Sequence, residues 1–387
     1  MRGALDASMN VHSTDDIFWM RRALVLASGV LYSTTPNPRV GCVIVRDGNV
    51  VGEGATQPVG GPHAEVMALR DAQARGESVA GATVYVTLEP CSHYGRTPPC
   101  VDALIAASPA RVVVAMGDPN PRVDGEGFAR LRAAGIHVTT GVCVDEALAL
   151  NIGFVARMSR GTPWLWMKIA ASLDGRSALH NGRSQWITGP EARADGHHWR
   201  ARSCAVLTGI GTVLADDPQM NVRHVQTPRQ PRKLLLDSRF EVPLSAKLLD
   251  GAETWIFTAV ENPAKAAQLA ERNVRVMCMP DAKGKVDLPA MMRWLAAEGI
   301  NEVHAEAGEK LNGSLLREAC VDELLLYQAP MLLGDAAGMA SLPALESLDQ
   351  ALRFEYTDVQ RVGVDLRVRA HLAVRWQALR AEVAFGN

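Results

Sequence analysis

The chain has 387 residues, of which 48% are hydrophobic, and its 40 basic and 42 acidic side chains leave a net charge of −2. This length predicts two domains, and the ordinary apolar content excludes extensive disorder. The near balance of charge gives no reason to expect a nucleic-acid or membrane-surface partner.

Targeting and redox signals favour the cytoplasm. The first twenty residues carry acidic side chains where a signal peptide needs a continuous apolar core. No apolar run reaches about 18 residues, the length that would predict a membrane span. The seven cysteines are an odd number scattered over a long chain, which does not indicate a disulfide framework. We therefore expect a cytoplasmic protein.

The first 150 residues alternate helical and strand-like patterns. Asp15–Gly29 has helical apolar spacing behind an acidic start, and "RVGCVIVRDGNVVGEG" is typical of a hairpin around "RDGN". The later patterns predict a helix from Pro62, a strand in "ATVYVTLEP", a helix after Pro99, a strand in "RVVVAMGDP", a helix in "GFARLRAAG" and a strand in "IHVTTGV". This alternation predicts a layered α/β domain over residues 1–150.

A second alternation fills residues 151–387. "ALALNIGFVARMSRGTP" predicts a connecting helix, and the residues after Trp376 are expected to form a ragged tail. Strand-like runs recur at "WLWMKIAASLDG", "CAVLTGIG", "RKLLLDS", "ETWIFTAV", "VRVMCMP", "EVHAEAG" and "ELLLYQAPMLLG", with helices between several of them. The two halves share no obvious repeat, so we expect two different domains.

The first half contains a candidate metal site in "GGPHAEVMAL" and "EPCSHYGRTPPC". His63, Cys91 and Cys100 supply one imidazole and two thiolates, which is the three-ligand count of a catalytic zinc site. Prolines beside these residues predict helix starts, where the dipole favours thiolates. A disulfide, or thiols that merely pack, remains the alternative. A structural zinc module with His93 as fourth ligand is a second alternative.

The arrangement matches the zinc deaminase signature, a His-x-Glu followed by Pro-Cys and a second cysteine. Glu65 then occupies the position of the proton shuttle, two residues after His63. The cysteines are separated by eight residues rather than the usual two. This gap and the balanced charge disfavour a plain nucleobase or tRNA-adenosine deaminase with an unrelated second domain, which stays the enzymatic alternative.

The second half lacks the Gly-x-Gly-x-x-Gly pattern of a Rossmann domain. "TGIGTVLADDP" alone predicts a strand, a glycine turn and a helix start. In "AEAGEKLNGSLL" a strand ends at Glu306 and a helix follows, whose free amide groups could bind phosphate. A strand, turn and helix with an exposed glutamate is the structural alternative.

These motifs together resemble one family, the bifunctional riboflavin-biosynthesis deaminase/reductase. "TPNPRVGCVIV", "HAEVMAL", "EPCSHYGRTPPC" and "DPNPRVDGEG" resemble its deaminase half, and "KIAASLDGRSA", "SQWITG", "TGIGTVLADDP" and "EAGEKLNGSLL" its reductase half. The resemblance spans about Asp15 to Arg375. It implies a cytidine-deaminase-like three-layer α/β/α domain followed by a dihydrofolate-reductase-like α/β domain, with Zn²⁺ and NADPH as cofactors.

The resemblance also implies roles in the deaminase half. His63, Cys91 and Cys100 would hold zinc, and Glu65 would pass a proton to the leaving amine. Base and phosphate of the substrate, a phosphoribosylaminopyrimidine, would contact Asn37, His93 and Arg96. The chain departs from the family at Thr56 and Met67, where histidines are frequent. Neither position is a ligand or the proton shuttle, so the departures put only a substrate contact in doubt.

In the reductase half the resemblance implies a cofactor site and a substrate site, with Asp174 at their mouth. The residues expected to line NADPH are Ala170, Trp186, Thr212, Asp216, Ser238, Gly308, Glu309, Lys310, Leu311, Asn312, Gly313 and Ser314. The residues expected to hold the substrate are Ser184, Arg200, Met220, Arg223 and Glu306. No proton donor is evident from the sequence. The expected partners are the small-molecule substrate and further copies of the chain in a homodimer or homotetramer, with no nucleic acid and no membrane.

Overall fold

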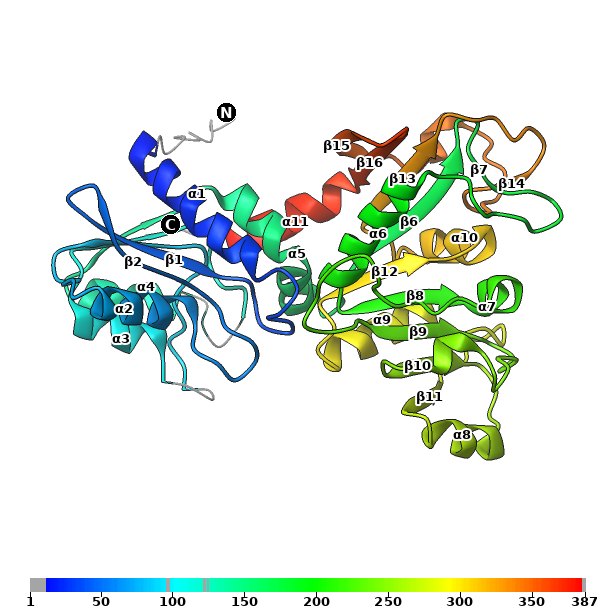
Figure 1. Ribbon diagram of the computed structural model, residues 1–387, viewed down its shortest axis with the longest axis horizontal. Helices are drawn as coiled ribbons and strands as arrows, with labels where there is room; N and C mark the ends of the chain where they lie inside the picture. Colours follow the sequence, from blue (N-terminus) through cyan, green and yellow to red (C-terminus); the bar gives the residue numbers. More distant parts are fainter. Residues whose placement is uncertain (1–11, 95–97, 121–122, 124, 385–387) are drawn as a thin grey trace, which may run out of the picture. The chain divides into compact units, whose positions relative to one another are not determined.

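The computed structural model describes residues 12–94, 98–120, 123 and 125–384. The described residues up to Asn151, together with those from Arg380 onward, form one compact unit, and Ile152–Leu379 form the other. The chain passes between the units inside helix α5 (Val144–Arg160), at the non-helical residue Asn151, and again inside helix α11 (Ala373–Val383). Both helices are labelled in Figure 1.

Helix α11 corrects the expectation of a ragged C-terminal tail. It continues to Val383, and two of its apolar side chains are buried, with Leu379 and Val383 only 3% and 1% exposed. The carbonyl of Val383 also accepts a hydrogen bond of 3.2 Å from the backbone N–H of Gly117.

The first unit is built on one mixed sheet with the strand order β2-β1-β3-β4-β5. Its strands are β1 (Gly41–Arg46), β2 (Asn49–Ala55), β3 (Thr83–Val86), β4 (Arg111–Val114) and β5 (His137–Thr140). The predicted hairpin is confirmed, since β1 and β2 pair antiparallel around Asp47 and Gly48, both with positive φ. Strands β3, β4 and β5 run parallel.

Helices cover both faces of this sheet. The helices are α1 (Thr14–Gly29), α2 (Ala64–Ala74), α3 (Cys100–Ala107) and α4 (Glu126–Ala133). Helix α1 packs on β1, β3 and β4, whereas α2 packs on β1 and β2 and contacts α3, which contacts α4. Figure 1 shows α1 on one face of the sheet and α2, α3 and α4 on the other. This confirms the predicted three-layer α/β/α arrangement.

The second unit contains a nine-stranded sheet with the order β11-β10-β9-β8-β12-β6-β13-β16-β15. Its strands are β6 (Trp164–Ser172), β8 (Ala205–Gly209), β9 (Arg232–Leu236), β10 (Thr254–Thr258), β11 (Val274–Cys278), β12 (Glu302–Glu306), β13 (Glu323–Ala329), β15 (Glu355–Val362) and β16 (Asp365–His371). The strands from β11 to β13 are parallel, and β16 and β15 add an antiparallel edge. A small second sheet pairs β7 (Arg176–Ala178) with β14 (Ala337–Gly338).

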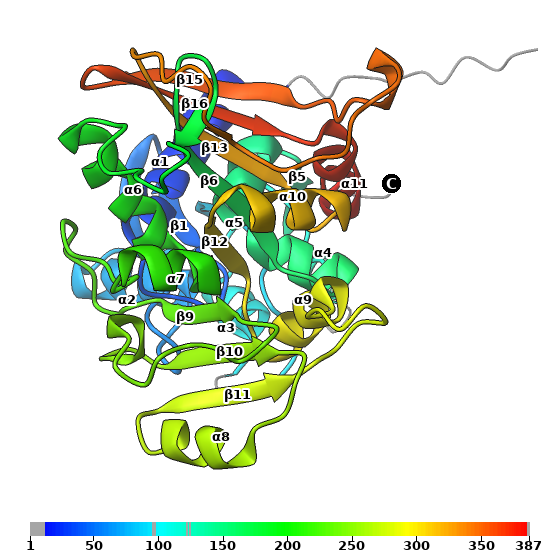
Figure 2. The ribbon, with the colours of Figure 1, turned by 90° about the vertical axis from the view of Figure 1, so that its right-hand side faces the viewer.

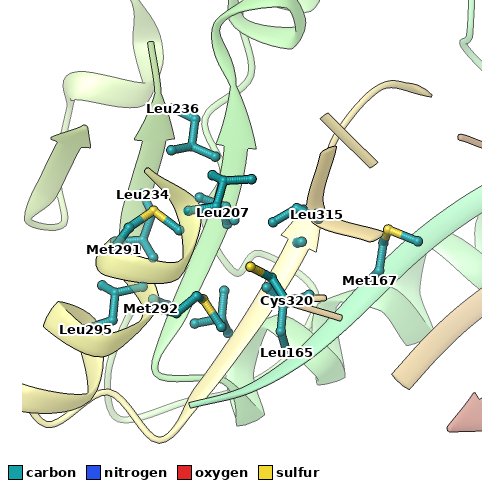
Figure 3. Close-up of a cluster of buried hydrophobic side chains, with 14 of the residues drawn as sticks. Leu165, Met167, Leu207, Leu234, Leu236, Met291, Met292, Leu295, Leu315 and Cys320 are labelled. Carbon is teal, nitrogen blue, oxygen red and sulfur yellow. The ribbon is translucent and has the colours of Figure 1, made fainter. Parts of the chain in front are cut away.

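Alternating side chains give this large sheet an apolar core on each face. Leu207 and Leu234 belong to one cluster, while their neighbours Val206 and Leu235 belong to the other. In Figure 3 methionines and a leucine of α9 lie against the strand leucines of the first cluster. The helices are α6 (Pro190–Arg202), α7 (Ile210–Asp216), α8 (Pro263–Ala270), α9 (Leu288–Ala297) and α10 (Glu309–Arg317), with short 3₁₀ turns η1 (Lys247–Leu249) and η2 (Leu348–Gln350).

This layering places the carboxyl ends of the parallel strands at one edge of the sheet. Figure 2 shows α6 and α7 on one side of the sheet and α9 and α10 on the other. Open α/β sheets bind ligands just beyond such strand ends. Strands β6, β8, β9 and β12 therefore converge on a place suited to a ligand.

Candidate active sites

The predicted zinc ligands lie together in the first unit. His63 is the N-cap of α2, Cys100 is the first residue of α3, and Cys91 lies in the loop between β3 and α3. The Nδ1 atom of His63 is 3.5 Å from Sγ of Cys91 and 3.3 Å from Sγ of Cys100. The sequence predicted both cysteines at helix starts, which is wrong for Cys91. Its sulfur nevertheless accepts a hydrogen bond of 3.3 Å from the backbone N–H of Cys100, the first residue of α3.

This triangle fits a tetrahedral zinc ion. Zinc lies about 2.0–2.1 Å from an imidazole nitrogen and about 2.3 Å from a sulfur, which sets the two ligand atoms roughly 3.6 Å apart. The three ligand atoms lie within 4.8 Å of one another, and both cysteines are free thiols. Among the described residues this metal-ligating group has three members and does not include His93. Three protein ligands are typical of a catalytic zinc site rather than a structural one.

Glu65 lies in the first turn of α2 and is only 3% exposed. Burial, followed by the nearby Cys91 thiolate, raises the pKa of its carboxyl to about 7. A hydrogen bond with Cys100, followed by one with His63, lowers the pKa of the Cys91 thiol. A carboxyl that titrates near 7 can both accept and donate a proton at neutral pH, so this arrangement is suited to proton transfer beside the metal.

Glu89 fixes the turn that carries the first cysteine ligand, a function that sequence reasoning did not assign. Its buried carboxylate accepts hydrogen bonds from the backbone N–H groups of Asp118, Gly125 and Gly127, at 3.4, 3.2 and 3.0 Å. A Cβ atom at Gly127 would lie 2.4 Å from the carbonyl oxygen of Pro90. The sequence held one signal for this function of Glu89. An acidic residue stands between a predicted buried strand and Pro-Cys, where a solvent-exposed side chain is not expected.

The other predicted deaminase residues have different surroundings. Asn37 lies in a turn, where its backbone N–H donates to the carbonyl of Thr34 at 2.9 Å. His93 is half-buried, and its buried Nδ1 atom has no hydrogen-bond partner within the described part of the chain. Arg96 lies outside the described residues.

The two departures from the family pattern lie in the structured part of this unit. Thr56 is buried, and both its backbone N–H and its hydroxyl donate to the carbonyl of Val40, at 3.0 and 3.4 Å. Met67 is half-buried on α2, close to Gly54. Neither side chain belongs to the ligand group.

The loop that carries Asn37 is held by a second residue that sequence reasoning missed. Asn151 is fully buried, and its side-chain amide pairs with the backbone N–H and the backbone carbonyl of Arg39, both at 2.8 Å. The Arg39 side chain donates in turn to the carbonyls of Leu31 and Leu150. Sequence reasoning placed Asn151 inside a connecting helix, where such a contact leaves no pattern.

The second unit contains a cavity of about 1170 Å³ at the carboxyl ends of its parallel strands. The predicted residues that line it are Ala170, Ser184, Trp186, Arg200, Thr212, Asp216, Met220, Arg223, Ser238, Glu306, Gly308, Glu309, Lys310 and Leu311. Asn312, Gly313 and Ser314, which follow these residues in α10, are not among the lining residues. A Cβ atom at Gly313 would lie 2.0 Å from the carbonyl oxygen of Ser341, so the backbone of the Ser341 segment approaches α10 closely at this residue.

Asp174 does not line the cavity either. Its carboxylate accepts hydrogen bonds from the hydroxyl of Ser172 at 2.5 Å and from the backbone N–H groups of Leu333 and Gly334. The Ser172 bond, followed by these backbone bonds, lowers the pKa of Asp174 to about 2. Asp174 therefore holds the backbone of Leu333 and Gly334 in place.

Glu306 and Arg200 form a bidentate pair in the wall of the cavity. The Nε and Nη2 atoms of Arg200 donate to the two carboxylate oxygens at 2.5 and 2.9 Å, and Lys168 lies 3.9 Å from the same carboxylate. Burial alone would raise the pKa of Glu306, but Arg200 and Lys168 outweigh it and hold the pKa well below its ordinary value. Glu306 is thus a charged hydrogen-bond acceptor at neutral pH.

The fold and the two sites define a class of protein. A His-Cys-Cys metal site with a buried glutamate, in a three-layer domain, is the arrangement of a zinc-dependent deaminase. A separate unit of the same chain carries a cavity large enough for a cofactor and a substrate. The molecule is therefore a deaminase joined to a second enzyme.

Comparison with known proteins identifies the family. Residues 13–116 match the family model of the cytidine and deoxycytidylate deaminase zinc-binding region, and residues 163–368 match that of the RibD C-terminal domain. The riboflavin biosynthesis protein RibD of Escherichia coli strain K12 is 48% identical over 365 residues, which cover 91% of this chain and 98% of that protein. The chain belongs to the RibD family of riboflavin biosynthesis proteins.

Solved structures agree with this assignment. Acinetobacter baumannii RibD matches with a TM-score of 0.84 at 45% identity and covers 92% of this chain and 98% of that one. A diaminohydroxyphosphoribosylaminopyrimidine deaminase/5-amino-6-(5-phosphoribosylamino)uracil reductase of Thermotoga maritima matches with a TM-score of 0.83 at 32% identity and covers 92% and 99% of the two chains.

The family assignment confirms several predictions made from the sequence. The chain is a bifunctional enzyme of riboflavin biosynthesis, with a zinc-dependent deaminase and an NADPH-dependent reductase. The two predicted fold types are those of its two parts. None of the helices described here is long and apolar enough to cross a membrane.

Proposed function

We propose that the protein catalyses two consecutive reactions on one pyrimidine. The first hydrolyses the amino group of 2,5-diamino-6-(5-phosphoribosylamino)pyrimidin-4(3H)-one and yields 5-amino-6-(5-phosphoribosylamino)uracil. The second reduces the ribosyl group of that product to give 5-amino-6-(5-phosphoribitylamino)uracil. Support comes from the family and from the two activities for which the Thermotoga maritima relative is named. The observation that carries the proposal is the ligand triangle beside Glu65, in a unit separate from the cofactor-sized cavity.

In the deamination, His63, Cys91 and Cys100 hold zinc. A zinc ion bound there lowers the pKa of water toward about 7 and so supplies a nucleophile at neutral pH. Glu65, buried in the first turn of α2 beside the ligand group, would accept a proton from the nucleophile and return it to the departing amino group. The residues proposed to contact base and phosphate are Asn37, His93 and Arg96.

In the reduction, the ribosyl ring opens to an imine or aldehyde, and bound NADPH would supply a hydride to its C1 carbon while water supplies the proton, which gives the ribityl chain. The protein orients the cofactor and the sugar and binds the phosphate. The residues proposed to contact the cofactor are Ala170, Trp186, Thr212, Asp216, Ser238, Gly308, Glu309, Lys310 and Leu311. The residues proposed to contact the substrate are Ser184, Arg200, Met220, Arg223 and Glu306. The support for both sets is that each member lines the same cavity.

We further propose a deaminase domain over residues 1–150 and a reductase domain over residues 151–387. The protein is expected to work in the cytoplasm as a homodimer or homotetramer. Apolar side chains on the antiparallel edge of the large sheet support self-association, since Tyr356, Val359 and Val364 are 78%, 57% and 59% exposed. Sedimentation equilibrium tests this, and a monomer at micromolar concentration contradicts it.

An assay of the purified protein tests the two reactions. With the diamino substrate alone, one equivalent of ammonia should be released and the uracil derivative should accumulate. Addition of NADPH should then oxidise one equivalent of cofactor and yield the ribityl product. Ammonia release without subsequent oxidation of NADPH, or oxidation of NADPH by a substrate that still carries both amino groups, would show that this order of reactions is wrong.

A further inference from the structure

His197 lies in the wall of the reductase cavity. It belongs to α6, is only 5% exposed, and precedes Arg200 by three residues on the same helix. Residues three apart on a helix lie on one face, so both side chains can reach the same segment of chain. Neither the family resemblance nor the proposed reaction assigns a function to His197.

The segment that faces these two side chains is irregular. Residues 217–231 form neither a helix nor a strand, so their backbone groups need other partners. The backbone carbonyl of Asn221 accepts from Nη1 of Arg200 at 2.8 Å. The backbone N–H and carbonyl of Val222 pair with the side-chain amide of Gln230 at 2.8 and 3.1 Å. Side chains of other residues thus provide the hydrogen bonds that these backbone groups would form with a neighbouring strand in a sheet.

His197 completes this series at the next residue. Its Nδ1 atom accepts a hydrogen bond of 3.2 Å from the backbone N–H of Arg223. The ring of His224 packs against it edge-on, with the ring centroids 4.7 Å apart and the ring planes at 86°. A neutral imidazole has one donor and one acceptor, so acceptance at Nδ1 leaves the ring hydrogen on Nε2.

The protonation state of His197 agrees with this contact. Burial, followed by the positive charges of Arg200 and Arg223, lowers the pKa of the imidazole to about 3. The ring is therefore neutral at working pH and keeps its acceptor. A neutral ring does not bind an anionic ligand as a third cation beside Arg200 and Arg223, so that alternative function of His197 is excluded.

We propose that His197 is a positioning residue of the reductase: its Nδ1 atom fixes the backbone of Arg223 and thereby directs the Arg223 guanidinium toward the phosphate of the substrate. The inference rests on the proposed contact between Arg223 and that phosphate. A guanidinium binds phosphate through paired hydrogen bonds, which depend on the direction from which the side chain approaches. A fixed backbone at Arg223 spares the complex the cost of ordering this segment on binding.

Two nearly isosteric substitutions distinguish the function of the Nδ1 atom of His197 from that of its Nε2 atom. His197→Asn retains an acceptor close to the position of Nδ1, whereas His197→Gln places its polar group close to Nε2. We expect His197→Gln to raise the KM for the phosphorylated substrate about tenfold, with the KM for NADPH unchanged, because one neutral hydrogen bond is lost. His197→Asn should stay within about threefold of wild type. Deamination by the same preparations and their thermal melting serve as the controls for folding.

A double-mutant cycle tests whether the effect passes through Arg223. If His197 acts only by placing that side chain, His197→Gln should change the KM little in an Arg223→Ala background. If the KM increases caused by His197→Gln and Arg223→Ala multiply in the double variant, the inference is wrong. It is also wrong if His197→Asn raises the KM as much as His197→Gln does. An impaired Asn variant beside a normal Gln variant would instead make Nε2 a substrate contact. The wild-type product assay tests the proposed reactions separately, so failure of the cycle leaves them intact.

Discussion

The carboxyl of Glu65 is buried next to the ligand group without being part of it. Glu65→Gln removes the titrating group and nearly preserves the shape of the side chain. We expect deamination to fall about a hundredfold or more, because general acid–base catalysis contributes roughly that factor. Zinc content, measured by atomic emission, should be unchanged, and reduction of supplied 5-amino-6-(5-phosphoribosylamino)uracil should be normal. Loss of zinc in this variant would make Glu65 a ligand rather than a proton shuttle.

Arg223 gives the second prediction for a single residue. It is exposed at the cavity, where its guanidinium is held by the side chain of Asn221 at 2.7 Å. Loss of one charge-assisted contact with phosphate should cost about 1.5–3 kcal/mol, so Arg223→Ala should raise the KM for the phosphorylated substrate by about one to two decades. The KM for NADPH should change little.

Controls for this prediction come from charge and from substrate. Arg223→Lys keeps the positive charge but loses the paired hydrogen bonds of the guanidinium. Its KM for the phosphorylated substrate should therefore lie between those of wild type and Arg223→Ala. A dephosphorylated substrate should be used poorly by wild type and no worse by the variant. A change confined to the KM for NADPH would instead assign Arg223 to the cofactor.

Single residues also show what a sequence can and cannot predict. The grouping of His63, Cys91 and Cys100 was predictable because metal chemistry restricts both the residue types and their neighbours. The bidentate pair of Arg200 and Glu306 was not, because its partners are 106 residues apart and each alone is compatible with a substrate contact. From the sequence alone, a charged residue near a motif can pair equally well with a bound ligand or with another side chain.

At the scale of elements, the first turn of α4 approaches the turn that carries Cys91, the first of the two cysteines proposed to bind zinc. Gly127 lies in that first turn, and a Cβ atom there would lie 2.4 Å from the Pro90 carbonyl and 3.0 Å from the Glu89 carboxylate. Gly127→Ala must therefore shift α4 or the turn. We expect zinc affinity, measured by competition with a chromophoric chelator, to fall about tenfold or more, as when the support of a metal ligand is disturbed.

A matched glycine is the control for this element. Gly29 ends α1, and nothing lies within 4 Å of a Cβ atom built there. Gly29→Ala should leave zinc affinity at the wild-type value. Equal zinc affinity in wild type and Gly127→Ala would show that the turn tolerates the displacement.

Prediction of strands succeeded where their side chains are buried. The hairpin of β1 and β2 was predictable because its turn residues and apolar runs agree. Strand β15 was missed because most of its side chains are exposed on both faces, which erases the alternation that marks a half-buried strand. The end of α11 was missed because two apolar side chains four residues apart, Leu379 and Val383, do not distinguish a packed helix from a tail in the sequence.

At the scale of the whole molecule, the two candidate sites have no residue in common. All three proposed zinc ligands belong to the first unit, and every residue that lines the proposed reductase cavity belongs to the second. Removal of zinc with a chelator should therefore abolish deamination and leave the reduction of supplied 5-amino-6-(5-phosphoribosylamino)uracil unchanged. Readdition of zinc should restore ammonia release from the diamino substrate.

Variants without zinc ligands make this argument independent of the chelator. A Cys91→Ser, Cys100→Ser double variant retains one of the three ligands, so it should purify without zinc and release no ammonia. A metal that binds only the folded state also stabilises it, so melting of the first unit should move to lower temperature while that of the second stays in place. Calorimetry should then resolve two transitions, of which only one responds to zinc. If chelation stops reduction of the supplied intermediate, or if both transitions shift together, the two halves depend on each other and the independence inferred from their separate residues is wrong.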